Sequence, residues 1–270
     1  MSTAATTAPP PPSRGASGAP TRAAIPDGPG RWIVQGRVVE MPVVVRDASS
    51  AAVTWLVPSA PARRLVPAGL EVVEVLPGRT LFSLAAIDYR DNDLGDYGEV
   101  SMAFFVRRAG ERATLPVPWL GDAIDFLRGG LATWIWKLPV DQSFTCDAGS
   151  GVWGFPKSVE RIEFEDAGAL RTCRLDMDGR RVLALSVPRG GTRTLPDAPM
   201  TTFTEIDGRL HRTTFTSGSS EVGFSLGGAT LELGAHPIAD ELRSLGLPRR
   251  ALLCVWMGRQ HARFDAPVPA

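Results

Sequence analysis

The chain has 270 residues, with 29 basic residues, 29 acidic residues and three histidines, and this length suffices for one large or two small domains with a sizeable core. The formal net charge of zero excludes a general nucleic-acid binder, because such proteins need a basic surface to neutralise phosphates. No apolar run reaches the roughly 18 residues that a membrane helix requires. The cysteines Cys146, Cys173 and Cys254 are far apart and form neither a disulfide framework nor a metal-binding spacing, which favours a reducing cytoplasm.

The first 30 residues differ in composition from the rest of the chain. Nearly all of them are Ala, Pro, Thr, Ser or Gly, including the run Pro9–Pro12. A segment with so few large apolar side chains cannot bury a core, and this one lacks the apolar stretch of a secretory signal. We therefore predict a disordered leader over residues 1–30, followed by a single domain over residues 31–270.

After the leader, most of the chain has the composition and turn signals of β-strands. Four β-rich segments are Arg37–Arg46, Val53–Val57, Thr80–Asp88 and Glu99–Val106. The turn pairs Asp178-Gly179, Asp207-Gly208 and Gly227-Gly228 then each separate two strand-like runs, a pattern typical of hairpins. A closing buried strand is expected over Ala251–Met257.

Helices are expected to be few. Apolar residues at helical spacing predict one helix over Asp122–Trp136, and Lys137 is expected to interact with its last carbonyl groups. His236-Pro237 predicts the start of a second helix, which runs through Leu245. The predicted fold is α+β, a curved and largely antiparallel β-sheet that forms a cone or barrel, with few helices.

The densest polar cluster, Asp88–Glu99, contains the only two tyrosines of the chain, Tyr89 and Tyr97. Its spacing does not match a calcium-binding loop, and Arg90 within it opposes a cation. One interpretation is a solvated turn between two strands. The other is a loop at the mouth of a cavity that delivers Glu99 or Arg90 inward.

Lysine is rare in this chain, since Lys137 and Lys157 are the only two among its 29 basic residues. Lys157 directly follows Trp153, Phe155 and Pro156, and apolar surroundings disfavour an ammonium and lower its pKa. A neutral amine can attack a ketone to form a Schiff base. The alternative is a lysine whose aliphatic stem merely covers the aromatic rings.

Two motifs together resemble the acetoacetate decarboxylase family, in particular its actinobacterial branch. They are Tyr97-Gly98-Glu99 and, about sixty residues later, Trp153-Gly154-Phe155-Pro156-Lys157. The resemblance runs from about Pro42 to the C-terminus. It implies a cone or barrel around a buried pocket, with Lys157 as the Schiff-base lysine and Glu99 as the carboxylate that handles protons. It also implies a homo-oligomer that needs no metal or organic cofactor.

The chain departs from the decarboxylating members of that family at three positions. Ser158 stands where they carry a second lysine, Ser83 where our alignment puts another glutamate, and Ala48 near the place of an early arginine, with Arg46 close but unmatched. Acetoacetate itself is therefore in doubt as substrate.

The sequence consequently predicts a lyase that acts on a ketone or β-keto acid through Lys157. Decarboxylation and aldol condensation with dehydration both remain open. Tyr97, Trp153, Phe155 and Arg90 are predicted to contact the substrate. The alternative function is a non-catalytic barrel that binds a small molecule in the same cavity.

Overall fold

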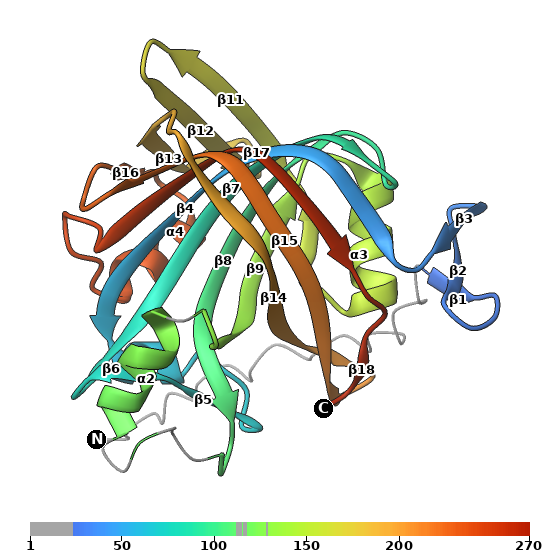
Figure 1. Ribbon diagram of the computed structural model, residues 1–270, viewed down its shortest axis with the longest axis horizontal. Helices are drawn as coiled ribbons and strands as arrows, with labels where there is room; N and C mark the ends of the chain where they lie inside the picture. Colours follow the sequence, from blue (N-terminus) through green and yellow to red (C-terminus); the bar gives the residue numbers. More distant parts are fainter. Residues whose placement is uncertain (1–23, 112–114, 116–117, 128) are drawn as a thin grey trace, which may run out of the picture.

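The computed structural model describes residues 24–111, 115, 118–127 and 129–270, and its centre is a closed, mixed β-barrel of seven strands (Figure 1). Around the barrel, hydrogen-bonded neighbours follow the order β8-β9-β14-β15-β17-β4-β7, and β7 pairs with β8 to close it. The strands are β4 (Val43–Pro58), β7 (Arg79–Asn92), β8 (Tyr97–Arg108), β9 (Ala132–Val140), β14 (Arg193–Ile206), β15 (Arg209–Ser225) and β17 (Leu253–Phe264). The predicted fold class is confirmed.

The barrel has one weak seam, between β9 and β14. These strands run parallel and share only two residue pairs, Thr202 with Thr133 and Phe203 with Trp134. The first part of β14 pairs only with β15. Along Arg193–Thr201, β14 is therefore not hydrogen-bonded to β9.

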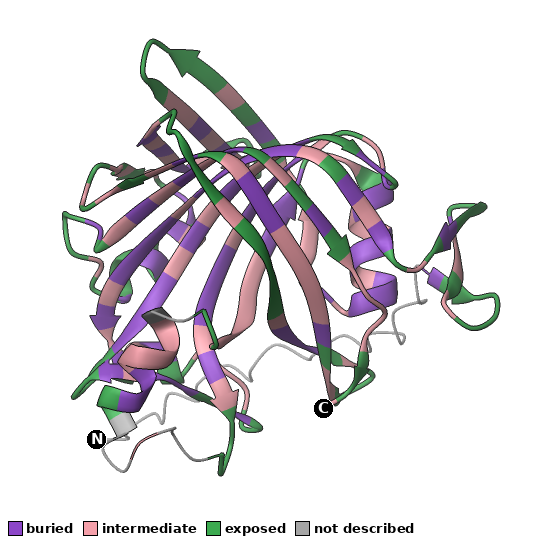
Figure 2. Ribbon diagram, viewed as in Figure 1, coloured by how far each residue is buried: buried purple, intermediate pink, exposed green. Residues whose placement is uncertain are grey.

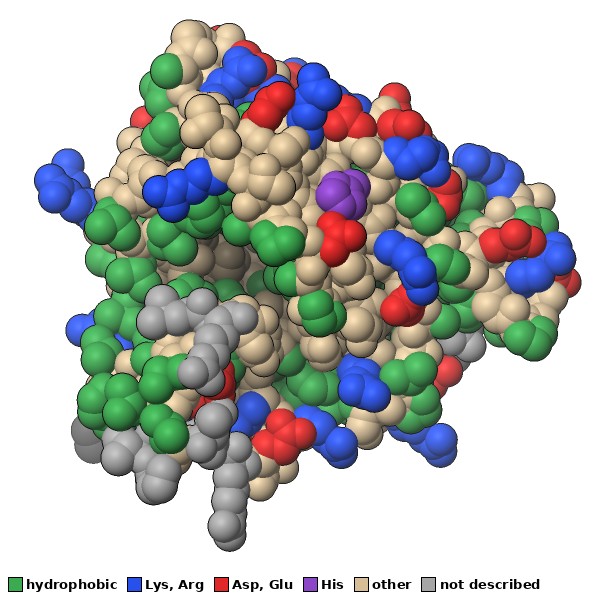
Figure 3. All heavy atoms as spheres, in the orientation of Figure 1, with side chains coloured by type: hydrophobic (Ala, Val, Ile, Leu, Met, Phe, Trp, Pro, Cys, Tyr) green, Lys and Arg blue, Asp and Glu red, His purple; other side chains and the backbone are tan. Residues whose placement is uncertain are grey.

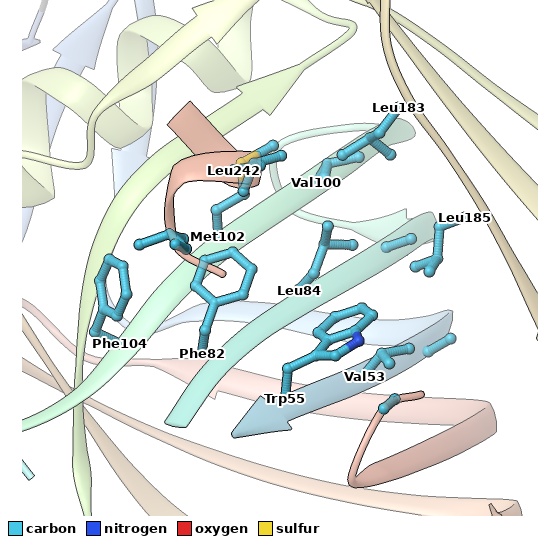
Figure 4. Close-up of a cluster of buried hydrophobic side chains, with 14 of the residues drawn as sticks. Val53, Trp55, Phe82, Leu84, Val100, Met102, Phe104, Leu183, Leu185 and Leu242 are labelled. Atoms are coloured by element: carbon cyan, nitrogen blue, oxygen red, sulfur yellow. The ribbon is translucent and has the colours of Figure 1, made fainter. Parts of the chain in front are cut away.

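A second layer covers the outer face of β4, β7 and β8. It consists of the sheet β11 (Arg161–Ala167), β12 (Leu170–Met177), β13 (Arg180–Pro188) and β16 (Thr230–Leu233), together with helix α4 (Pro237–Ser244). Side chains alternate across a strand, so every second residue along the covered parts of β4, β7 and β8 faces this layer. The resulting core is shown in Figure 4 and includes Trp55, Phe82, Met102, Phe104, Leu183, Leu185 and Leu242.

The remaining elements flank the barrel. They are β1 (Ala24–Pro26), β2 (Arg31–Val34), β3 (Arg37–Glu40), α1 (Ser59–Arg63), β5 (Leu70–Val72), β6 (Glu74–Leu76), α2 (Pro118–Leu127), α3 (Ser143–Trp153), β10 (Lys157–Val159) and β18 (Val268–Pro269). Figure 2 shows that burial alternates along the barrel strands, whereas the β1–β3 sheet is mostly exposed. None of the helices among the described residues has the length and apolar character needed to span a membrane.

The prediction of one helix over Asp122–Trp136 is wrong. Helix α2 ends at Leu127, and β9 begins at Ala132. Between them Gly129 has a φ of +69°, a left-handed conformation that ends helices and that glycine adopts without steric cost. Lys137 therefore lies in a strand opposite Met102 rather than at a helix end.

Two of the three predicted hairpins are confirmed. The turn at Asp178-Gly179 joins β12 to β13, and the turn at Asp207-Gly208 joins β14 to β15. The third is wrong, because the strands on either side of Gly227-Gly228 pair elsewhere: β15 with β17 and β16 with β13. The glycines mark the point where the chain leaves the barrel for the second layer.

Three further predictions concern the leader, the strand over Arg37–Arg46 and the helix after His236; the structure differs in the first two. Of the predicted leader, residues 1–23 lie outside the described residues, but Ala24–Pro26 form strand β1 and Ala24 is fully buried. The expected strand over Arg37–Arg46 is divided at Met41-Pro42 into β3 and β4. The helix that follows His236 is confirmed, and the His236 ring accepts a hydrogen bond from the Ile238 amide.

Candidate active site

The interior of the barrel holds a cavity of about 640 Å³, a volume typical of sites for small organic ligands. Its wall is mainly apolar and is formed by the inward side chains of all seven barrel strands, with further residues from α2, α3 and β10. Lys157 and Glu99 are the only charged residues among the described residues that line it.

Lys157 reaches the cavity because of the helix and turn that precede it. Helix α3 ends at Gly154, which has a φ of +71° and donates its amide hydrogen to Ser150 O. An added Cβ at Gly154 would lie 2.5 Å from Glu205 O, so glycine is required there on two grounds. The chain then turns through Phe155 and Pro156, and β10 pairs in parallel with β9, with Lys157 opposite Leu138.

The amine of Lys157 forms an ion pair with Glu99 inside the cavity. Nζ lies 2.8 Å from Glu99 Oε2, and the two side chains are only 4% and 8% exposed. Nζ also donates a hydrogen bond of 3.3 Å to Thr145 Oγ1. The stem of Lys157 passes over Gly149, where an added Cβ would lie 2.5 Å from Cε. The lysine is thus held at its tip by two partners and along its stem by the bare backbone of α3.

The protonation state of this pair differs from the one expected from sequence. Burial lowers the pKa of Lys157, but the Glu99 charge and its hydrogen bond more than offset that effect, so the pKa is raised above its ordinary value. The expectation that apolar surroundings lower the pKa of Lys157 is wrong for this pair, because the Glu99 carboxylate lies directly against the amine. The resting amine is an ammonium whose closest base is Glu99.

Two tyrosines complete the polar end of the cavity. The Tyr97 ring centroid lies 4.9 Å from Lys157 Nζ and stacks on the Tyr89 ring at 4.4 Å. The Tyr89 hydroxyl donates to Glu99 Oε1 over 3.4 Å. Burial raises the pKa of both phenols, so both remain neutral donors at physiological pH.

Trp153 and Phe155 line the same end of the cavity; their contact with a substrate stays a prediction. Their rings stack with centroids 6.1 Å apart, and Trp153 Nε1 donates to Asp265 O over 2.8 Å. Arg90 lies elsewhere. It donates to Asp47 and to Gly258 O and lines a separate polar cavity, so it does not belong to the candidate site.

Three residues of the site were not among the sequence-predicted ones: Thr145, Gly149 and Tyr89. Thr145 and Gly149 lie on α3, a helix that the hydrophobic pattern does not predict. The one sequence signal for it is Gly154, because a glycine commonly follows the last residue of a helix; the Gln142 side chain, which accepts from the Thr145 amide, is not a typical start signal.

The departures from the decarboxylase pattern have distinct positions. Ser83 lines the cavity. Ser158 follows Lys157 in β10 and is not among the lining residues. Ala48 is fully buried, whereas Arg46 is half-exposed and forms ion pairs with Asp91 and Asp93. A basic side chain therefore contributes to the cavity only at Lys157, within the part of the chain that the structure describes.

Comparisons with known proteins agree on one family. A family model described as acetoacetate decarboxylase (ADC) matches residues 34–262, whereas no curated protein sequence matches the chain. The finer placement in an actinobacterial branch stays a prediction.

The fold is similar to those of several solved structures. A crystal structure of acetoacetate decarboxylase from Legionella pneumophila has a TM-score of 0.62 at 15% identity, covering 85% of this chain and 87% of that one. The enduracididine biosynthesis enzyme MppR, complexed with the condensation product of pyruvate and imidazole 4-carboxaldehyde, has a TM-score of 0.54 at 19% identity, with coverages of 83% and 87%. An acetoacetate decarboxylase-like enzyme from Sphingomonas wittichii RW1 has a TM-score of 0.52 at 13% identity, with coverages of 87% and 96%.

Proposed function

The chain belongs to the acetoacetate decarboxylase family, and from this premise we propose that it is a lyase that forms a Schiff base between Lys157 and a ketone or β-keto acid. The observation that carries the proposal is the Lys157–Glu99 pair, 2.8 Å apart and buried in an otherwise uncharged, mainly apolar cavity.

The first step is activation of the amine. Glu99 accepts a proton from the Lys157 ammonium, which leaves a neutral amine and a carboxylic acid within hydrogen-bonding distance. The amine attacks the substrate carbonyl carbon to form a carbinolamine, in which the carbonyl oxygen takes one proton from the attacking nitrogen. Glu99 returns the second proton to that oxygen, which then leaves as water. The products of this step are a protonated iminium on Nζ and the Glu99 carboxylate, so the net charge of the site is unchanged.

The iminium then serves as the electron sink. In a β-keto acid, the bond to the carboxylate breaks, its electrons form an enamine, and CO₂ leaves. Glu99 delivers one proton taken from solvent to the enamine carbon, and water hydrolyses the resulting iminium to release the ketone. In a ketone, Glu99 instead removes a proton beside the iminium carbon, and the enamine can add to an aldehyde.

Both routes have support among related structures. The Legionella pneumophila structure is described as an acetoacetate decarboxylase, and MppR is described in complex with a condensation product. We assign neither route exclusively, since both use the same two residues. A cytoplasmic location and self-association remain predictions from the sequence.

The proposal is tested by exchanging each lysine for arginine. Arg keeps a positive charge but has no neutral amine, so Lys157→Arg is expected to lower CO₂ release from β-keto acids and product formation from ketone–aldehyde mixtures by at least about 10³-fold, since the covalent route has no substitute. Lys137→Arg is the matched control, because Lys137 lies in β9 and does not line the cavity; it is expected to retain activity. Equal turnover by both variants would reject covalent catalysis. Binding of ketones without turnover in the wild type would favour the non-catalytic barrel.

A further inference from the structure

The cavity extends far beyond the Lys157–Glu99 pair, and its continuation is shaped by small side chains. On β8 the inward residues are Glu99, Ser101, Ala103 and Phe105. Phe105 lies six positions after Glu99, which corresponds to about 20 Å along a strand. A substrate as small as acetoacetate would occupy only the first part of this length.

The strand register shows how this space arises. At the level of Glu99, the facing inward residues on β7 and β4 are Ile87 and Ser50. One level further from the amine, Ser101 faces Ala85, and Ala85 faces Ala52. This middle row thus presents only one hydroxymethyl and two methyl groups to the cavity.

The next level continues the same pattern. Ala103 lies opposite Ser83, and Ser83 lies opposite Thr54. The large side chains of these strands, such as Phe82, Leu84 and Met102, point to the opposite face and form the core with the second layer. A barrel of this size closes its interior when its inward side chains are large, so the small inward residues leave a channel.

The two ends of the channel differ. At the amine, aromatic side chains enclose the space: Tyr89, Tyr97, Trp153 and Phe155. The distal wall includes Phe105, Phe126 of α2 and Met200 of β14. Figure 3 shows a hollow in this face of the molecule, rimmed by hydrophobic side chains. The site therefore has room for a small group at one side of the carbonyl and a long apolar group at the other.

The few charged residues in the cavity lining indicate which substrates the cavity favours. Among the described lining residues, the only cation is Lys157, and Glu99 already pairs with it. Polar groups such as Ser50, Gln260 and Ser217 bond to one another: Ser50 Oγ donates to Gln260 Oε1 at 2.6 Å and Gln260 Nε2 donates to Ser217 Oγ at 3.0 Å. A carboxylate retained through the reaction, as in a 2-keto acid, would find no cation besides the lysine nitrogen and would lie near the Glu99 carboxylate, which is unfavourable for a buried charge.

We propose that the substrate is a methyl ketone, or the β-keto acid that yields one, with an uncharged apolar tail that runs from Glu99 towards Phe105 between β4, β7 and β8. The inference rests on the proposed function, because it assumes that the carbonyl carbon lies at Lys157 Nζ. It adds the length, the polarity and the direction of the rest of the substrate.

The test is the concentration dependence of reductive trapping across a series of ketones. Wild-type protein is treated with cyanoborohydride and acetone, 2-pentanone, 2-heptanone or pyruvate, and adduct formation is followed by intact mass. Burial of each methylene group improves binding about fourfold, so the half-saturating concentration is expected to fall by about two orders of magnitude from acetone to 2-heptanone. Pyruvate is expected to be trapped more weakly than 2-pentanone.

A channel variant supplies an independent measurement. Ala85→Phe fills the middle row and is expected to raise the half-saturating concentration of 2-heptanone at least tenfold while leaving acetone unchanged; trapping of acetone also shows that the variant is folded. Ala109→Phe, at an exposed position that does not line the cavity, is the matched control and is expected to behave as wild type. If Ala85→Phe does not fold, the half-saturating concentrations of the ketone series with wild-type protein still test whether the substrate has a long apolar tail.

The outcomes separate the two proposals. No adduct with any ketone would overturn the Schiff-base function itself. Adducts with all ketones at similar half-saturating concentrations, or tighter trapping of pyruvate, would overturn the long apolar tail and leave the Schiff-base function standing.

Discussion

The contact between Lys157 and the backbone of α3 gives a sharp test of the site geometry. Gly149 lies directly beneath the lysine stem, and a Cβ there would be 2.5 Å from Lys157 Cε and 2.6 Å from Cδ. Ordinary contact begins at 3.4 Å, so Gly149→Ala must displace the middle of the side chain by about 1 Å. The lysine cannot swing into solvent at no cost, because it is only 4% exposed and is held by Glu99 and Thr145.

A displacement of about 1 Å at a reacting group costs on the order of 10²-fold in rate. Gly149→Ala is therefore expected to lower both the rate of adduct trapping and turnover by about that factor. The fold should be retained, since Ala is favoured over Gly in a helix by about 1 kcal/mol, which offsets part of the clash. The assays are borohydride trapping, steady-state rates and thermal unfolding.

The control is Ser143→Ala, at the exposed start of the same helix, which is expected to leave the trapping rate unchanged. A Gly149→Ala variant that is folded and traps ketones at the wild-type rate would refute the reasoning. It would show that the position of the lysine stem over α3 does not govern reactivity.

Three further predictions follow from the ion pair and the N-terminal sheet. Glu99→Gln keeps the shape but cannot exchange a proton near neutral pH, so turnover should fall by about 10²–10⁴. Trapping should persist, although more slowly, because burial without the carboxylate favours the neutral amine that attacks the carbonyl, and water can carry the protons. Full turnover would remove Glu99 from the mechanism. The raised pKa of Lys157 makes the wild-type pair stabilising below the unfolded value of about 10.4, a contribution lost as pH rises through the folded pKa. In Glu99→Gln the main raising cause is removed, and burial, the largest single cause, is expected to bring the folded pKa of Lys157 below the unfolded one. Stability should then increase as pH rises from the folded pKa to the unfolded one. Urea unfolding of both proteins measures the difference, and parallel pH profiles would contradict Glu99 as the cause of the raised pKa. Deletion of residues 1–23 should leave the melting temperature unchanged. Deletion of residues 1–40 should lower the free energy of unfolding by about 3 kcal/mol or more, because it removes the buried Ala24 and Val34 beside α3. Equal melting temperatures of the two deletion variants would show that the β1–β3 sheet does not support the helix.

Residue type, together with the resemblance to a known family, was sufficient to single out the two charged residues that line the cavity. Lysine is so rare in this chain that Lys157 behind its aromatic run stood out, and the Tyr97-Gly98-Glu99 motif singled out the carboxylate. The sequence could not show that the two lie 2.8 Å apart, because Glu99 is in β8 and Lys157 in β10, and only the pairing of both β8 and β10 with β9 brings them together. The direction of the lysine pKa shift depends on that contact.

The errors in the fold prediction have a common origin in long-range pairing. Leu131 and Ile135 fit the helical period, but β9 forms because β8 offers partners from Met102 to Val106. Gly227-Gly228 is a genuine turn signal, yet the strands that flank it find partners far along the chain. In α3, the sequence Ser143–Trp153 is rich in small and polar residues, so it lacks the apolar period by which helices are recognised.

The central claim is that the amine of Lys157 forms a covalent bond with the substrate. Its most direct test is borohydride reduction of the protein in the presence of a methyl ketone, followed by proteolysis and mass mapping of the modified peptide. The chain has only two lysines, so the assignment is unambiguous. The account predicts a reduced adduct on Lys157 and none on Lys137 in the folded protein. An adduct confined to Lys137, or equal labelling of both lysines, would contradict it.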